Sequence, residues 1–140
     1  IGLTMDTTRA DMTQAVLEGV AFAIRDSFEV AKSLGIKIER SKICGGGAKS
    51  PLWKKIIANV LNIKIDSIES EEGPGYGGAM LAGVGCGIYE SVETACQAMI
   101  SPEKTSMPDE KEAELYGRYH KLYKKLYLSL NENYRELAGL

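Results

Sequence analysis

The sequence lacks several features that are typical of particular classes of protein. It contains no apolar run long enough to span a bilayer, no segment resembling a secretory signal, and no excess of basic charge: 17 Lys and Arg stand against 19 Asp and Glu, for a net charge of −2. These absences argue against a membrane or nucleic-acid partner. Three cysteines without a C-x-x-C pair and one histidine argue against a disulfide framework or a zinc site. We therefore expect buried thiols in a cytoplasmic protein.

The chain also lacks an initiator methionine, since it begins Ile1-Gly2-Leu3. We expect a piece of a longer polypeptide. With 140 residues, of which 44 % are hydrophobic and 26 % charged, it has the size and composition of one globular domain.

Apolar periodicity and breaker residues predict an alternation of helices and short strands. A helix over 10–34 is expected to bury a stripe that includes Met12, Val16 and Val20, and to stop at Gly35. The other expected segments are a strand at 40–44, a helix at 51–62, a strand at 63–66, a helix of small residues at 76–88, a helix at 91–99, a loop through Pro102 and Pro108, and a helix at 109–136. This pattern predicts an α/β fold, helix-rich with a short parallel β core. Two strands are too few for a sheet, so further strands precede Ile1 or the chain pairs with a copy of itself.

The helix at 76–88 is unusual because glycine and alanine dominate it, although each glycine weakens a helix by roughly 1 kcal/mol relative to alanine. Such a composition predicts that another backbone comes very close to this helix.

Three consecutive glycines follow the expected strand at 40–44, and a helix opens directly after them, with Ser50 as its N-cap and Pro51 in its first turn. A turn without Cβ atoms brings bare backbone and a helix N-terminus next to a ligand. It is equally an ordinary strand-to-helix connector, and the turn alone leaves both interpretations open. The turn matches neither G-x-x-x-x-G-K-[ST] nor G-x-G-x-x-G, so Lys49 gains no phosphate role from those motifs.

At this point the chain resembles the FGGY family of carbohydrate kinases, xylulokinases in particular. The family carries a strand followed by G-G-G-A-[KR]-S and a helix with Trp near its start; here the segment is Ile43 to Trp53. Gly2-Leu3, Asp11-Met12 and Ala15 to Glu18 fit the end of a second family signature, and Gly75 to Gly83 is similar to a third.

The resemblance implies an actin-like, RNase H-like ATPase domain, of which residues 1–140 would be the C-terminal part. It places the glycine turn beside the adenosine of ATP, which makes the candidate nucleotide-binding residues Gly45, Gly46, Gly47, Ala48, Lys49 and Ser50. ATP with Mg²⁺ would be the cofactor of the whole enzyme, and the sugar, with xylulose the nearest expectation, would bind through an N-terminal domain. The catalytic Asp and the phosphate loop of the family would precede Ile1. Asp6, Asp11, Asp66 and Asp109 match neither element, so no catalytic or metal-binding residue is named, and the chain alone is expected to be inactive.

Four other features have simple structural interpretations. Trp53 is expected in the core and His120 to be solvated or locally bonded, with the hydroxyls of the tyrosines around it, including Tyr116, reaching water. Glu69, Glu71 and Glu72 are expected to form a solvated acidic turn, and nothing decides the role of Arg9.

Two alternatives remain open. One is a non-enzymatic module that dimerises through its helices and carries a vestigial nucleotide pocket. The other is a different actin-like nucleotide-binding ATPase, such as a kinase-like regulator.

Overall fold

The computed structural model describes residues 1–68 and 73–140, with the backbone alone at 102 and 103. Helices and short strands alternate along the chain in this order: α1 (Arg9–Ser33), β1 (Arg40–Ile43), the 3₁₀ turn η1 (Gly46–Lys49), α2 (Pro51–Leu61), β2 (Lys64–Ile68), α3 (Pro74–Gly85), α4 (Val92–Met99), β3 (Pro102–Ser106) and α5 (Glu110–Ala138). The expected helices are confirmed to within a few residues at each end. The acidic turn expected at Glu69 to Glu72 lies outside the described residues.

Local capping explains where the helices begin and end. Thr8 and Asp11 form a capping box at the start of α1, and the hydrogen bonds from Thr8 lower the pKa of Asp11. Beyond the other end of α1, Gly35 has φ +83°; its N–H donates to the Lys32 carbonyl, and the N–H of Ile36 donates to the Ala31 carbonyl. This is the Schellman geometry that the predicted stop at Gly35 requires.

The sheet has three strands in the order β1-β2-β3, with β1 parallel to β2 and β3 antiparallel to β2. The expected loop through Pro102 is therefore wrong, because residues 102–106 form a strand. The short β core is mixed rather than purely parallel. The segment has no alternating apolar pattern, and its strand conformation comes from pairing with the edge of β2.

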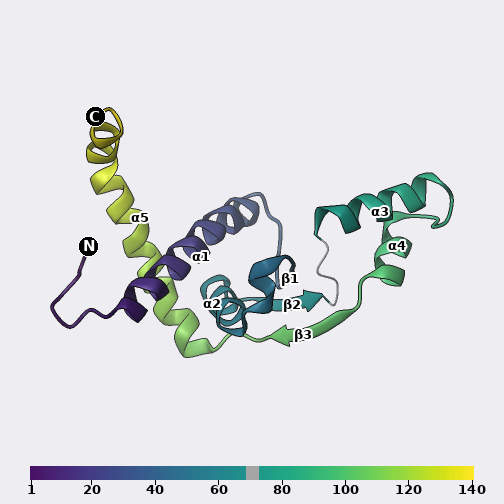
Figure 1. Ribbon diagram of the computed structural model, residues 1–140, viewed down its shortest axis with the longest axis horizontal. Helices are drawn as coiled ribbons and strands as arrows, with labels where there is room; N and C mark the ends of the chain where they lie inside the picture. The colour runs from purple at the N-terminus through teal and green to yellow at the C-terminus, as the bar shows by residue number, and fades with distance from the viewer. Residues whose placement is uncertain (69–72) are drawn as a thin grey trace.

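The core is built around α2, whose residues 56–61 are all buried. They pack against β2 and against Ala21 and Phe22 of α1 and Tyr116 of α5. α1 and α5 cross beside α2, while α3 and α4 lie beyond the other end of the sheet (Figure 1). The hydrophobic core of the described chain thus lies on one side of the molecule.

The buried face of α1 differs from the predicted stripe. Met12, Val16 and Val20 are about half or more exposed, whereas Ala21 and Phe22 are buried. Apolar residues occur on more than one side of this helix, so periodicity alone selected the wrong side for its first half.

The small-residue helix α3 also departs from expectation. A Cβ added at Gly77, Gly78 or Gly85 would meet no atom within 4 Å, so among the described residues no backbone approaches α3 closely at these positions. α4 and the turn before it pack on α3: the Tyr76 hydroxyl donates to the Met99 carbonyl at 2.5 Å, and the ring of Tyr89 lies against Gly83. Within the described ranges, no helix has both the length and the apolar character needed to cross a bilayer.

Candidate functional site

The glycine turn lies at the edge of the sheet where the parallel strands β1 and β2 both end. β1 leads through Cys44 and Gly45 into η1 and α2. The chain entering α3 is close by, because a Cβ placed on Gly73 would lie 4.0 Å from the Cys44 sulfur. Ligands of open α/β sheets bind outside the carboxyl ends of parallel strands, so this edge is where a binding site is expected.

Two of the three glycines are required by the backbone conformation and packing of the turn, without any ligand. Gly45 has φ +82°, a backbone conformation that residues with a Cβ rarely adopt. A Cβ on Gly47 would stand 2.9 Å from both Cδ1 and Nε1 of Trp53, a distance that real Cβ atoms essentially never show. Gly45 is therefore needed for the shape of the turn, and Gly47 for its contact with the indole.

Gly46 is different. Its φ is not positive, and a Cβ added to it would meet nothing within 4 Å. It is exposed on the turn. No contact in the described chain explains why this position is glycine, and its bare face is open to whatever lies outside.

The rest of the turn joins it to α2. The Ser50 hydroxyl accepts a hydrogen bond from the Trp53 N–H at 3.2 Å, which confirms Ser50 as the N-cap. Trp53 is partly buried and packs against the hydrophobic core, as predicted. Ala48 is partly buried and Lys49 is exposed. The structure thus brings all six predicted residues into one turn, and the Ser50 cap satisfies one of the donors at the start of α2.

The four aspartates considered in the sequence analysis are distributed among structural roles. Asp66 is buried and binds Arg40 Nε at 2.9 Å and the Thr105 hydroxyl at 2.6 Å. Asp11 belongs to the α1 capping box, and Asp109 caps α5, where the N–H of Glu112 lowers the pKa of its carboxyl. Asp6 is exposed. In the parts of the chain that the structure describes, no three His, Cys, Asp or Glu side chains are grouped in a way that could hold a metal ion.

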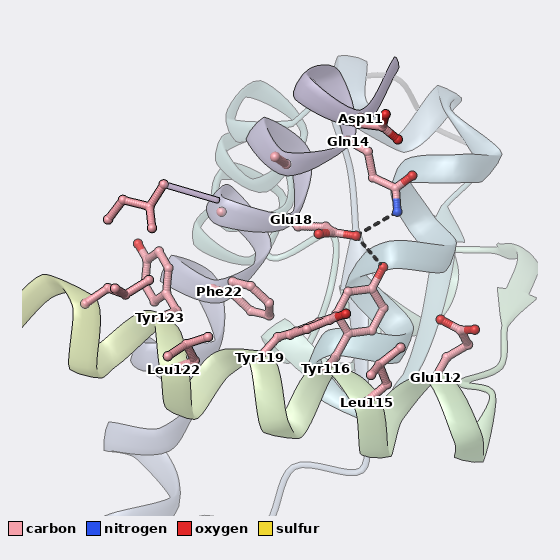
Figure 2. Close-up of a pocket in the computed structure, with 14 residues that line it drawn as sticks. Asp11, Gln14, Glu18, Phe22, Glu112, Leu115, Tyr116, Tyr119, Leu122 and Tyr123 are labelled. Atoms are coloured by element: carbon pink, nitrogen blue, oxygen red, sulfur yellow. Dashed lines mark hydrogen bonds between the residues drawn. The ribbon is translucent and has the colours of Figure 1, made fainter. Parts of the chain in front are cut away.

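A second concave feature lies between α1 and α5 and was not foreseen from the sequence. This groove of about 600 Å³ is lined by aromatic and apolar side chains of both helices and by three carboxylates, those of Asp11, Glu18 and Glu112. Figure 2 shows Glu18 between Gln14 and Tyr116: its carboxylate accepts from the Gln14 amide and from the Tyr116 hydroxyl, each at 2.8 Å. Burial, reinforced by the bond to Glu18, raises the pKa of Tyr116 above its usual value.

Two expectations about α5 are corrected at this crossing. The Tyr116 hydroxyl does not reach water but binds Glu18, and the ring is buried. His120 is buried as well, with Nε2 lying 2.8 Å from Asp26 Oδ1 on α1. The partners are 98 and 94 residues apart in the chain, so no local pattern could have revealed either pair. Both hydrogen bonds clamp α5 onto α1.

The cysteines also differ from expectation, because Cys44 and Cys86 are exposed and Cys96 is partly buried; all three are free thiols.

Comparison with known proteins assigns the chain to a class. It is 32 % identical over 127 residues to the xylulose kinase of Staphylococcus epidermidis and 36 % identical over 129 residues to the glycerol kinase of Saccharolobus islandicus. These alignments cover 91 % and 89 % of this chain but 26 % of each relative. The chain thus spans about a quarter of the length of these relatives.

Solved structures share the fold. The gluconate kinase of Lactobacillus acidophilus superposes with a TM-score of 0.86 at 25 % identity, over 98 % of this chain and 28 % of the other. A Plasmodium falciparum glycerol kinase with ADP superposes with a TM-score of 0.72 at 23 % identity, over 89 % and 26 % of the two chains. The class defined by this fold is that of the sugar and polyol kinases with an actin-like ATPase domain.

Residues 1–86 match the C-terminal domain of the FGGY carbohydrate kinases. The chain belongs to this family, whose members phosphorylate sugar hydroxyls with ATP.

Proposed function

We propose that the chain is the adenosine-binding, C-terminal part of an ATP-dependent carbohydrate kinase, and that residues 45–50 contact the nucleotide. The observation that carries the proposal is Gly46, whose open face is not needed by any contact in the described chain. A planar base can lie against bare backbone at such a position. The turn also lies where ligands of parallel sheets bind, at the carboxyl ends of β1 and β2.

The proposal divides the reaction between this chain and the rest of the enzyme. ATP supplies the phosphoryl group, and phosphoryl transfer further needs Mg²⁺, phosphate-binding donors and a base for the sugar hydroxyl. The described residues fit the base end of the nucleotide, since the space into which a Cβ on Gly46 would project is open to a planar base. The described carboxylates do not fit the Mg²⁺ requirement, because they have structural partners or stand apart. This chain therefore binds and orients adenosine, and alone it does not transfer phosphate.

The sugar is proposed from the relatives. Xylulose is the first candidate because a xylulose kinase aligns along most of this chain; glycerol and gluconate kinases align too, so the alternatives are a triol and a sugar acid. The sugar would bind through a separate N-terminal domain. We also propose a cytoplasmic location, which the free thiols and the use of ATP support.

An NMR titration of the 140-residue chain with ADP tests the nucleotide proposal. We expect weak binding, with a dissociation constant near or above the millimolar range because only one side of the nucleotide is contacted, and amide shifts concentrated at residues 45–50. Gly46→Val should abolish these shifts, because its side chain would occupy the place of the base. Gly117→Ala, which adds a methyl in open space on α5, is the control that should leave them intact. Equal ADP affinity in Gly46→Val and the parent would refute the assignment of the turn.

A second candidate function, a helical dimerisation module, is favoured by the distal half of α5. Residues spaced alternately three and four apart form one seam along the helix: Ala113, Tyr116, His120, Tyr123, Tyr127, Leu130, Tyr134 and Leu137. The first members of this seam pack on α1, but Tyr127, Tyr134 and Leu137 are more than half exposed on the end that projects from the body (Figure 1). A/d-type seams of this spacing pair helices. Light scattering decides between the candidates: a dimer that Leu137→Glu disrupts supports the module, and a monomer at all concentrations contradicts it.

A further inference from the structure

The glycine turn is open at Gly46 and packs against the Trp53 indole at Gly47. The edge of the Trp53 indole lies directly against Gly47, so closely that a methyl group there would be 2.9 Å from two ring atoms. Gly47 and Gly46 are neighbours in a 3₁₀ turn, where successive residues project about 120° apart. One therefore faces the indole while the other faces open space.

Trp53 is held in place through both its side chain and its backbone. The indole packs against the hydrophobic core. The backbone N–H of Trp53 donates to the Ser50 hydroxyl at 3.2 Å, and the backbone N–H of Ser50 donates to the Gly47 carbonyl at 3.1 Å. Gly47, Ser50 and Trp53 thus form a closed set of contacts that joins the path of the turn to α2.

We infer that Trp53 is a positioning residue for nucleotide binding: its indole fixes the height and path of the turn through Gly47, and so sets the surface that Gly46 offers to the base. The inference rests on the proposed nucleotide-binding function and adds a residue that does not itself touch the nucleotide. It also explains why the second and third glycines of the turn are glycine for different reasons, one for the ligand and one for the protein.

A double-mutant cycle with ADP titration tests the inference. Gly47→Ala should push the turn off the indole and weaken ADP binding about tenfold, since overpacking of this kind is met by backbone shifts. Trp53→Phe has a smaller ring and should weaken binding about twofold on its own. Combined, the two should recover binding to within about threefold of the parent, because the smaller ring makes room for the methyl.

Readouts other than affinity separate positioning from general stability. The amide shifts of residues 45–50 without ADP should move in Gly47→Ala and return toward the parent in the double variant. Trp53 is the single tryptophan of the 140 residues, so its fluorescence emission reports how the indole packs against the turn. Leu61→Ala, which damages the core away from the turn, should lower the melting temperature yet leave the ADP affinity of the folded chain unchanged.

The outcomes distinguish the proposed role of Trp53 from the proposed nucleotide site. If Gly46→Val abolishes ADP binding while Gly47→Ala and Trp53→Phe bind like the parent, the role of Trp53 is refuted and the nucleotide site stands. Additive losses in the double variant would also refute it. If the parent shows no ADP shifts at 45–50, the proposed function fails, and the inference about Trp53 fails with it.

Discussion

Helices α2 and α3 follow the two parallel strands at the same edge of the sheet, yet they are held in opposite ways. α2 buries every residue from 56 to 61 between the sheet, α1 and α5. α3 buries only Met80 and Gly83 and packs on α4 and the turn before it. The same topological position thus carries a core helix in one case and a thinly covered helix of small residues in the other. The difference indicates that the stability of this chain comes from the α1–α2–α5 side.

The largest effect on stability is expected when one leucine of α2 and one leucine of α3 are each replaced by alanine. Leu61 of α2 is 4 % exposed and Leu81 of α3 is 62 % exposed. Leu61→Ala should lower the free energy of unfolding by about 3 kcal/mol through lost burial and the cavity left behind. Leu81→Ala should change it by less than about 0.5 kcal/mol. Urea denaturation followed by circular dichroism measures both, and similar losses in the two variants would contradict the comparison.

The next test removes one tyrosine hydroxyl from the α1–α2–α5 side of the molecule and one from the α3–α4 side. Tyr116→Phe deletes the donor to Glu18 that clamps α5 onto α1, and should cost about 1 kcal/mol of global stability. Tyr76→Phe deletes the bond to the Met99 carbonyl, and should speed amide exchange in α3 and α4 while the global unfolding midpoint stays in place. A global loss in Tyr76→Phe would show that the two sides unfold as one unit.

Tyr116 also gives the comparison a pH dependence. Its pKa is raised in the folded chain above the ordinary value of 10.0, so the folded state keeps a proton that the unfolded state loses. The resulting stability is fully present below pH 10 and falls as the pH rises beyond it. Tyr116→Phe should therefore flatten the alkaline limb of the stability curve, measured by urea denaturation at a series of pH values.

The smallest expected effect is a gain in stability. Gly78 lies inside α3 with open space where a Cβ would project, so Gly78→Ala should stabilise that helix by about 0.5–1 kcal/mol. Slower amide exchange in α3 is the measurement. Gly83→Ala is the contrast, because its methyl would come within 3.0 Å of the Tyr89 ring and should give no such gain. Faster exchange in Gly78→Ala would mean that something packs against this face.

Prediction from the sequence succeeded where the information was local. Caps and stops such as Ser50 and Gly35 depend on neighbouring residues, so the helices were located well. The strand at 102–106 was missed because it depends on pairing with β2. The buried side of α1 was misassigned because α2 and α5 decide which apolar side is covered, and neither is visible in the periodicity of α1.

The candidate site, like the fold, could be predicted from the sequence only in part. The motif located the turn, but the separate requirements of Gly45, Gly46 and Gly47 became visible only with backbone angles and the position of the Trp53 ring. The Glu18–Tyr116 and Asp26–His120 pairs join residues at opposite ends of the chain, and no spacing rule connects such distant positions.

Those two pairs have a consequence for the order in which the chain folds. They close loops of 98 and 94 residues, so they form late relative to local helix contacts, and closing such loops costs conformational entropy that local contacts avoid. During synthesis, Phe22 of α1 stays uncovered until α5 has emerged to pack on it. A ribosome that stalls before residue 116 would therefore release a chain with an uncovered aromatic surface, the kind of species that chaperones hold.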